Sequence, residues 1–269
     1  MATELVFVHR PKWALAISDS FIMIGRSLRH IIRNTDQLLG AFFQPIMFLV
    51  LFATVFGGAI SKALPPGVSY LNFLMAGIIV QTAAFGSTTT AIAVCNDLQK
   101  GLVDRFRSLP MSNLAVLTGH VVSDLFRNTV STVVMLITGL AIGFRPHASL
   151  TGWLLIAGIL FLFTLAFSWL SAVVGVLAKS VEGVQWLSFV LVFPLTFAST
   201  AFVPAEGMNP ILKAFAENQP ITQVIDSIRA LILGTPIGNH GWLAAAWSVG
   251  SILIAMPLAA WLFRRKTSN

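Results

Sequence analysis

Charged residues are scarce in this sequence. Lysine, arginine, aspartate and glutamate make up 10% of its 269 residues, whereas hydrophobic residues make up 56%. A soluble domain carries roughly 25% charged residues, because its surface faces water. The chain therefore has too few charges to cover a water-soluble surface, and the lipid bilayer is expected to be its solvent.

Cysteine pairs and common catalytic motifs are missing as well. A lone Cys95 excludes an intrachain disulfide and a cysteine metal cluster. No glycine opens a GxxxxGK[ST] loop, so we expect the chain not to hydrolyse ATP itself. GxSxG and HExxH are absent, and His120 with Asp124 would give a metal only two ligands. We expect no catalytic residue, metal or cofactor on this chain.

Long apolar runs recur along the whole chain. A helix needs about 20 apolar residues to cross a hydrocarbon core of about 30 Å. Six runs are long enough, namely 38–60, 71–94, 114–143, 154–178, 184–203 and 243–263. The third carries His120, Asp124 and Arg127 in its first half, so we expect its early turns to stand in the cytoplasm or among headgroups. The sequence predicts an all-α integral membrane protein with six transmembrane helices.

The net charge of +7 comes from basic residues at the edges of these runs. With the N-terminus inside, most basic residues fall in cytoplasmic segments, and the outer loops hold only Lys62, Arg145, Lys213 and Arg229. This imbalance predicts a multi-pass protein of the bacterial plasma membrane with both termini in the cytoplasm. No basic face is interleaved with aromatic residues, so no nucleic-acid partner is expected.

The stretch "NDLQKGLVDRFRSLPMS", residues 96–112, predicts a short amphipathic helix at 97–109. Its apolar side holds Leu98, Leu102, Phe106 and Leu109, and its polar side holds Asp97, Lys100, Asp104 and Arg107. Pro110 ends the run. Its mixed charge favours a protein partner, although a helix lying on the lipid surface is the alternative.

Two further segments have a helical pattern outside the spans. Arg26, Arg29 and Arg33 share one face of an amphipathic N-terminal helix, predicted to lie along the inner leaflet or simply to anchor to lipid. Between residues 204 and 241, Asn209-Pro210 and Pro220 are expected to start two helices, the second ending at Gly234. These helices could dip back into the membrane if their backbone is buried in protein; a surface lid is the alternative.

Two segments, "GLVDRFRSLPMSNLAVLTGHVVSDLFRN" and "NQPITQVIDSIRALILG", together with the six spans, resemble the permease subunit of type-2 ABC exporters. The daunorubicin/doxorubicin-resistance branch is the most similar, and the resemblance runs from about residue 21 to 263. It implies a coupling helix that docks on a separate ABC ATPase, present in two copies, which binds ATP and Mg. The coupling residues would be Asp97, Lys100, Gly101, Asp104, Arg105, Phe106, Arg107 and Leu109.

The resemblance also implies an interface helix within residues 1–37, a six-helix domain at 38–263, a basic tail at 264–269 and a second permease subunit in a homodimer. An outer re-entrant hairpin at 204–241 would include Asn218, Gln219, Pro220 and Arg229. Many relatives have a glutamate two positions before the glycine of the coupling helix. This chain has Gln99 there, which leaves open whether Asp97 or Asp104 pairs with the ATPase.

A pathway for the transported compound is predicted from phenylalanine and hydroxyl residues on two spans. They are Phe189, Phe193, Thr196, Phe197 and Thr200 on the fifth, and Gln81, Phe85 and Thr88 on the second. Such a lining suits a flat or greasy amphiphile, whereas a lipid-facing stripe is the alternative. The sequence predicts an ATP-driven exporter of a drug, antibiotic or lipid-like compound. Alternatives are a lipid-linked polysaccharide as substrate, or an ion-driven secondary transporter or channel.

Overall fold

The computed structural model describes residues 25, 35–65, 67–100 and 113–268, and all regular structure in these ranges is helical. The first half contains α2 (Thr35–Leu51), the π-helix η1 (Phe52–Phe56), α3 (Gly57–Ile60), the 3-10 helix η2 (Ser61–Ala63), α4 (Tyr70–Gly86), α5 (Thr88–Gln99) and α7 (Asn113–Ala141). The second half contains α8 (Leu150–Leu177), α9 (Val181–Phe197), the 3-10 helix η3 (Ala205–Gly207), α10 (Pro210–Asn218), α11 (Pro220–Leu233) and α12 (His240–Ser268).

Five helical segments of the described chain are long and apolar enough to cross a membrane: Phe42–Ala63, Tyr70–Gln99, Val116–Ala141, Leu150–Leu177 and His240–Lys266. The helix α9 is apolar but has only 17 residues. It ends at Phe197, so the predicted extension of this span to residue 203 is wrong. The Ser199 hydroxyl donates to the Thr196 carbonyl and accepts from the Ala201 N–H, which replaces helical bonds where the helix stops.

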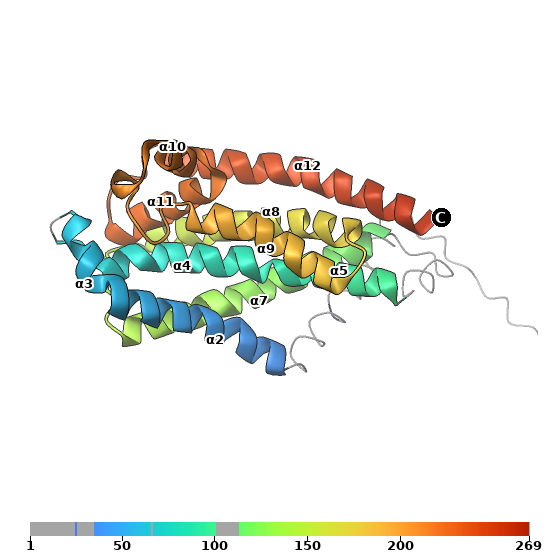
Figure 1. Cartoon of the computed structure of the whole chain (residues 1–269), viewed down its shortest axis with the longest axis horizontal. Helices are drawn as coiled ribbons and strands as arrows, with labels where there is room; N and C mark the ends of the chain where they lie inside the picture. The colour runs from blue at the N-terminus through green and yellow to red at the C-terminus, as the bar shows by residue number, and fades with distance from the viewer. Residues whose placement is uncertain (1–24, 26–34, 66, 101–112, 269) are drawn as a thin grey trace, which may run out of the picture.

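The long helices form a bundle in which α4 and α5 follow one another through the middle (Figure 1). The helix α12 runs along α8 for most of the length of the bundle, and α7 contacts both α4 and α8. We call the end where α5 and α12 finish the inner end, after the predicted orientation. The short helices α10 and α11 lie at the opposite, outer end.

Nearly every side chain of α4 is buried, because this helix is apolar all round and packs between α7, α8, α9 and α11. Small residues allow close approach at two points. A Cβ at Gly77 of α4 would collide with the backbone of Ala201, and a Cβ at Gly175 of α8 would collide with the backbone of Ala91 in α5. The second span is therefore held from both sides by direct backbone contact.

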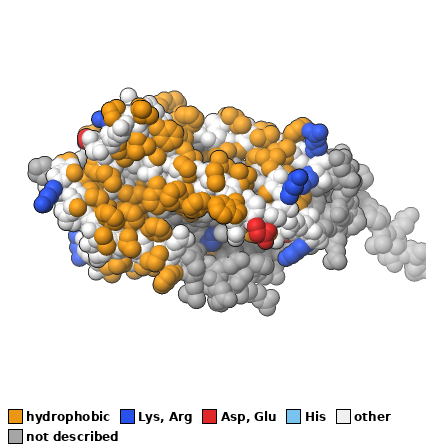
Figure 2. Space-filling model, viewed as in Figure 1, with side chains coloured by type: hydrophobic (Ala, Val, Ile, Leu, Met, Phe, Trp, Pro, Cys, Tyr) orange, Lys and Arg blue, Asp and Glu red, His pale blue; other side chains and the backbone are white. Residues whose placement is uncertain are grey.

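The space-filling view agrees with a membrane-embedded body (Figure 2). Hydrophobic side chains cover the middle of the face shown, and lysine and arginine side chains lie mainly toward its two ends. Large apolar side chains such as Phe43 (72% exposed) and Ile254 (68% exposed) point outward, as expected where lipid or another apolar surface is the neighbour.

The outer helices begin and end where the sequence predicts. Asn209 caps α10 by accepting from the Ile211 N–H, with Pro210 in the first turn. Pro220 begins α11. Gly234 ends it at φ +70°, a left-handed conformation that glycine adopts without a Cβ penalty. Local signals alone therefore set the limits of this pair of helices.

Candidate functional site

The last turn of α5 holds the first residues of the predicted coupling helix. Asp97 Oδ2 lies 2.9 Å from His120 Nε2 of α7, and both side chains are 15% exposed. Gln99 Nε2 donates to the Lys179 carbonyl at 2.8 Å. Leu98 packs against a cluster of buried apolar residues from α5, α7, α8 and α12. Asp97 therefore already has a partner within its own chain, whereas Lys100 is exposed.

The other predicted inner residues lie outside the described ranges. Gly101, Asp104, Arg105, Phe106, Arg107 and Leu109 fall within 101–112, and Arg26, Arg29 and Arg33 fall within 26–34. Their roles in coupling and in the interface helix stay predictions.

An ion pair on α7 is buried inside a candidate span. Arg127 donates to the Asp124 carboxylate, whose other oxygen accepts from the Ser168 hydroxyl of α8. Asp124 is 2% exposed and Arg127 is 8% exposed, so the pair is buried within the bundle, where a carboxylate and a guanidinium can satisfy each other. The expected position of these early turns in the cytoplasm or among headgroups stays a prediction. We call Asp124 and Arg127 the inner clamp.

The inner clamp contacts an interruption in the second span. The helix α4 ends at Gly86 and α5 begins at Thr88. The Arg127 guanidinium donates to the Gly86 carbonyl and to the Thr89 hydroxyl, so one side chain binds both sides of the interruption. Arg127 is thus directed at the middle of a neighbouring span, and Asp124 is its partner.

A second pair of the same kind lies at the outer end, on α11. Arg229 donates to Asp226, to the Thr200 carbonyl and to the Phe73 carbonyl of α4. Its guanidinium carbon also lies 3.6 Å from the centre of the Phe73 ring. We call Asp226 and Arg229 the outer clamp. Burial lowers the pKa of Arg229 to about 10 while Asp226 opposes the shift, so the side chain is charged at neutral pH.

The other predicted residues of the outer hairpin fix the connection between α10 and α11. Gln219 Nε2 donates to the Ala198 carbonyl, just after α9, at 2.6 Å. Asn218 Nδ2 donates to the Ala214 carbonyl of its own helix at 2.8 Å. Gln223 bridges the hairpin to His240 of α12, with 2.8 Å between Oε1 and Nδ1. The hairpin is thereby tied to α12 and to the segment that follows α9, and Arg229 also ties it to α4.

The predicted pathway residues separate into two groups. Gln81, Thr196 and Thr200 are buried, and the two hydroxyls bond within the protomer, Thr196 to the Val192 carbonyl and Thr200 to Asp226. Phe85, Thr88 and Phe197 are half-buried, while Phe189 and Phe193 are exposed. The structure therefore does not bring the eight residues to one surface.

The phenylalanines do form one continuous series of ring contacts, which we call the aromatic ladder. Its ring centroids are 4.9 Å apart for Phe189 and Phe193, and 4.2 Å apart for Phe193 and Phe197. It continues through Phe202 to Phe52 and Phe56 of η1, with the last two steps at 4.5 and 5.1 Å. Sequence reasoning missed this continuation, although Phe48, Phe52 and Phe56 have the same four-residue spacing as the ladder on α9.

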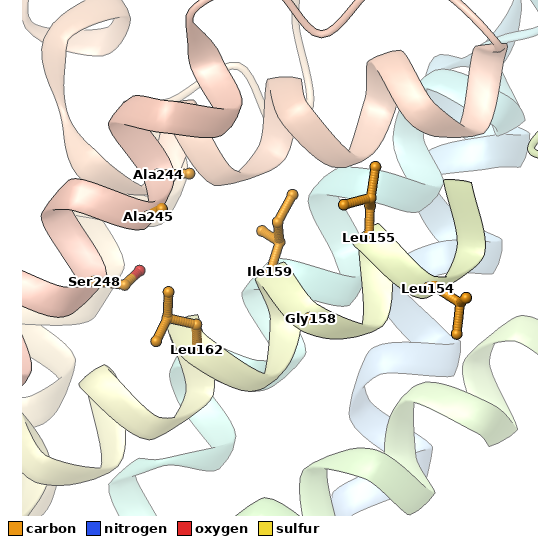
Figure 3. Close-up of a pocket in the computed structure, with 8 residues that line it drawn as sticks. All are labelled: Leu154, Leu155, Gly158, Ile159, Leu162, Ala244, Ala245 and Ser248. Atoms are coloured by element: carbon orange, nitrogen blue, oxygen red, sulfur yellow. The ribbon is translucent and has the colours of Figure 1, made fainter. Parts of the chain in front are cut away.

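A shallow apolar groove of about 180 Å³ opens between α8 and α12 (Figure 3). It is lined by Leu154, Leu155, Gly158, Ile159, Leu162, Ala244, Ala245 and Ser248. Both walls belong to candidate spans, and its lining carries no charge. Among the described residues, no three His, Cys, Asp or Glu side chains lie together as a possible metal site.

These features define the class of the protein: a multi-pass helical membrane protein that holds buried ion pairs inside and near its spans. The profile of the ABC-2 type transporter family matches residues 19–233. The chain belongs to this family.

Three relatives illustrate the similarity. The daunorubicin resistance ABC transporter permease protein DrrB1 of Streptomyces coeruleorubidus is 29% identical over 269 residues, covering 100% of this chain and 94% of the relative. The probable doxorubicin resistance ABC transporter permease protein DrrC of Mycobacterium tuberculosis is 26% identical over 257 residues, covering 94% of this chain and 91% of that one. The inner membrane transport permease YadH of Escherichia coli is 23% identical over 195 residues, covering 71% and 74%.

The family membership confirms the predicted class. The chain is a permease, the transmembrane subunit of an ABC transporter, and it lacks ATPase activity. It follows that a partner subunit supplies ATP hydrolysis.

Proposed function

We propose that this permease exports a hydrophobic or amphiphilic compound, such as a drug, antibiotic or lipid-like molecule, across the bacterial plasma membrane. The observation that carries the proposal is the aromatic ladder, a continuous series of rings whose members Phe189 and Phe193 are exposed on α9. Aromatic faces bind flat, apolar molecules better than they bind a chain of sugars. The names of the two drug-resistance relatives support the same substrate class.

The substrate path would lie between two copies of the chain. Exposed side chains on α9 and α2 are large and apolar, including Val190 (58% exposed) and Phe43 (72% exposed). A second copy covering these helices would enclose the ladder between the subunits. Together with α9 as a sixth, short span, this gives two six-helix subunits around a central path. At about 1.5 Å per residue, the 17 residues of α9 extend roughly 25 Å, near the lower limit for crossing a bilayer.

Energy would enter from the inner end. Two copies of an ABC ATPase, binding ATP and Mg, would close and push on the coupling helices at 97–109. The attachment of the C-terminal end of α5 supports this entry point for the force. Asp97 binds this end to α7, and Gln99 binds it to the loop after α8. Since Asp97 is engaged with His120, we assign the contact with the ATPase to Asp104 rather than to Asp97. The interface helix carrying Arg26, Arg29 and Arg33 would lie beside it on the inner leaflet.

An ion-driven mechanism has one observation in its favour, the buried carboxylate of Asp124 in a candidate span. Intramembrane acids carry protons or bind sodium in many secondary transporters. Here both carboxylate oxygens are occupied, one by Arg127 and the other by Ser168. The acid is therefore neutralised within the protein, which favours a structural or coupling role.

The proposal is tested by reconstituting the permease and its ATPase in inverted membrane vesicles and following daunorubicin, whose own fluorescence reports uptake. We expect ATP-dependent uptake that stops when ATP is replaced by a non-hydrolysable analogue. Charge reversals Asp104→Arg and Arg107→Glu should reduce co-purification of the ATPase and uptake together. Lys62→Glu, an exposed charge reversal at the outer end, serves as the matched control and should change neither.

Two results would contradict the proposal. Uptake without ATP or without the ATPase would exclude the ATP-driven mechanism. ATP-dependent uptake of a lipid-linked polysaccharide, with no uptake of daunorubicin, would move the substrate to that class.

A further inference from the structure

The interruption of the second span is a local change in hydrogen bonding at Ser87, which keeps a right-handed helical conformation at φ −62° and ψ −17°. It has an identifiable cause. Residues 70–99 contain no proline, and helices without proline break mainly at Gly/Ser pairs or where a side chain enters the hydrogen-bond ladder. Both causes are present, because Gly86-Ser87 lies at the break and Arg127 reaches into it. The Thr90 N–H donates to the Ser87 carbonyl, three residues back. The Gly86 carbonyl instead accepts from the Thr89 hydroxyl at 3.0 Å and from Arg127.

Helix α7 packs closely against Gly86. A Cβ at this position would collide with the side-chain amide of Asn128. Gly86 therefore lets α7 approach until the Arg127 guanidinium can reach the exposed carbonyl.

The two halves of the span are attached to different parts of the molecule. The outer half, α4, is bound by the outer clamp through Phe73, and Tyr70 donates to the Phe202 carbonyl at 3.1 Å. The inner half, α5, is bound through Asp97 to His120 and rests on Gly175 of α8 through Ala91. Along the second span itself, movement at the inner end therefore reaches α4 through the break.

We propose that Asp124, Arg127 and Ser168 form a positioning site that fixes α5 relative to α4. Through it, a displacement at the inner end is passed to the outer end. Arg127 binds both sides of the break, Asp124 orients and neutralises Arg127, and Ser168 holds Asp124 against α8. This assignment rests on the proposed ATP-driven function.

The test separates positioning from simple stabilisation by removing both charges at once. A buried ion pair can usually be replaced by apolar residues of similar size without loss of stability, whereas removing one partner leaves an unpaired charge. We therefore expect Asp124→Leu and Arg127→Met singly to lower the apparent melting temperature of the complex by about 10 °C. The double variant should melt close to the parent but lack every hydrogen bond from residue 127 to the break.

The readout is the distance between two copies of the outer end in the assembled complex with its ATPase. A spin label on Ile211→Cys is suitable, because Ile211 is 84% exposed on α10. The buried Cys95 is replaced by alanine in the parent. We expect trapping with ATP and vanadate to shift this distance in the parent. In the double variant the shift should be lost while ATP hydrolysis continues.

Ser168→Ala and Ser123→Ala form the matched control pair, since both serines are buried. Ser168 donates to Asp124, whereas Ser123 donates to the Gly119 carbonyl of its own helix at 2.8 Å. We expect Ser168→Ala to reduce the shift and Ser123→Ala to leave it intact. A stable double variant with the full shift would overturn the positioning role. A parent complex that hydrolyses ATP without any shift would also overturn this inference, whereas the absence of ATP-dependent uptake would overturn the proposed function.

Discussion

The inner and outer clamps use the same pair of residues, an aspartate followed three positions later by an arginine. In each, the arginine also donates to a backbone carbonyl of α4, Gly86 in one and Phe73 in the other. In each, a hydroxyl donates to the aspartate, from Ser168 or from Thr200. The bonding pattern is therefore nearly the same at two places on one helix.

The clamps differ in how far their carboxylates are removed from solvent. The side chain of Asp124 is 1% exposed and that of Asp226 is 22% exposed, while the two arginines differ little, at 10% and 11%. The inner clamp lies in a candidate span, whereas α11 is not one. The same local motif should therefore contribute differently to stability at the two places, because the free-energy cost of leaving one charge unpaired increases with burial.

The largest difference should follow removal of the two aspartates. Asp124→Ala leaves the Arg127 guanidinium unpaired inside the bundle and should reduce the free energy of unfolding by about 3–5 kcal/mol. Asp226→Ala should lose about 1–3 kcal/mol, because Asp226 is partly exposed and Arg229 keeps its contact with the Phe73 ring. Unfolding in detergent by increasing denaturant measures both. Equal losses would mean that burial does not separate the clamps.

Two glycines of α4 should differ in the same way, but with a smaller loss of stability. A Cβ at Gly77 meets the backbone of Ala201, whereas a Cβ at Gly86 meets only the side chain of Asn128. We expect Gly77→Ala to lose about 3 kcal/mol and Gly86→Ala about 1 kcal/mol, since backbone cannot move aside. Gly158→Ala on α8 has open space and serves as the control, with no loss expected. The same denaturant measurement decides whether this order holds.

The hydroxyl donors should show a smaller effect in the same direction. Ser168→Ala removes a donor from a fully buried carboxylate and should lose about 1.5 kcal/mol. Thr200→Val should lose about 1 kcal/mol or less, because water can reach Asp226. A larger loss at Thr200 than at Ser168 would reverse the expected order of the clamps.

The smallest effect is expected at the pair that resembles the clamps least. Asp97 and His120 are on different helices and partly exposed, so Asp97→Asn should change the free energy of unfolding by less than about 1 kcal/mol. Glu217→Gln, at the exposed pair with Lys213, provides the control and should give no measurable change. A loss at Asp97 as large as that at Asp124 would place a third clamp at the inner end.

Much of the fold could be predicted from local pattern. Apolar runs located the long helices, and Asn209, Pro220 and Gly234 marked the limits of the outer pair, because capping and φ restriction act within a few residues. The length of α9 was predicted less well. Its end depends on the hydrogen bonds of the Ser199 hydroxyl, and counting apolar residues along the sequence does not reveal such bonds.

The candidate sites were harder to predict because they join residues far apart in the chain. Asp124 and Arg127 were expected in the cytoplasm or among headgroups, because hydropathy assigns a cost to each charge without showing its partner. Asp124 is hydrogen-bonded to Ser168, 44 residues away in the sequence. Arg127 is hydrogen-bonded to Gly86, 41 residues away. The aromatic ladder was predicted on α9 only, because its continuation requires Phe202, which lies beyond the end of α9, to meet Phe52 of η1.

The sequence by itself determined that the chain is helical, embedded in a membrane and without its own ATPase, because composition, periodicity and the lack of a phosphate loop are local properties. Only the tertiary structure decided that two aspartate–arginine pairs act on one central helix and that one of them spans a break. That outcome depends on which helices pack together, and only packing determines whether a charge is exposed or paired.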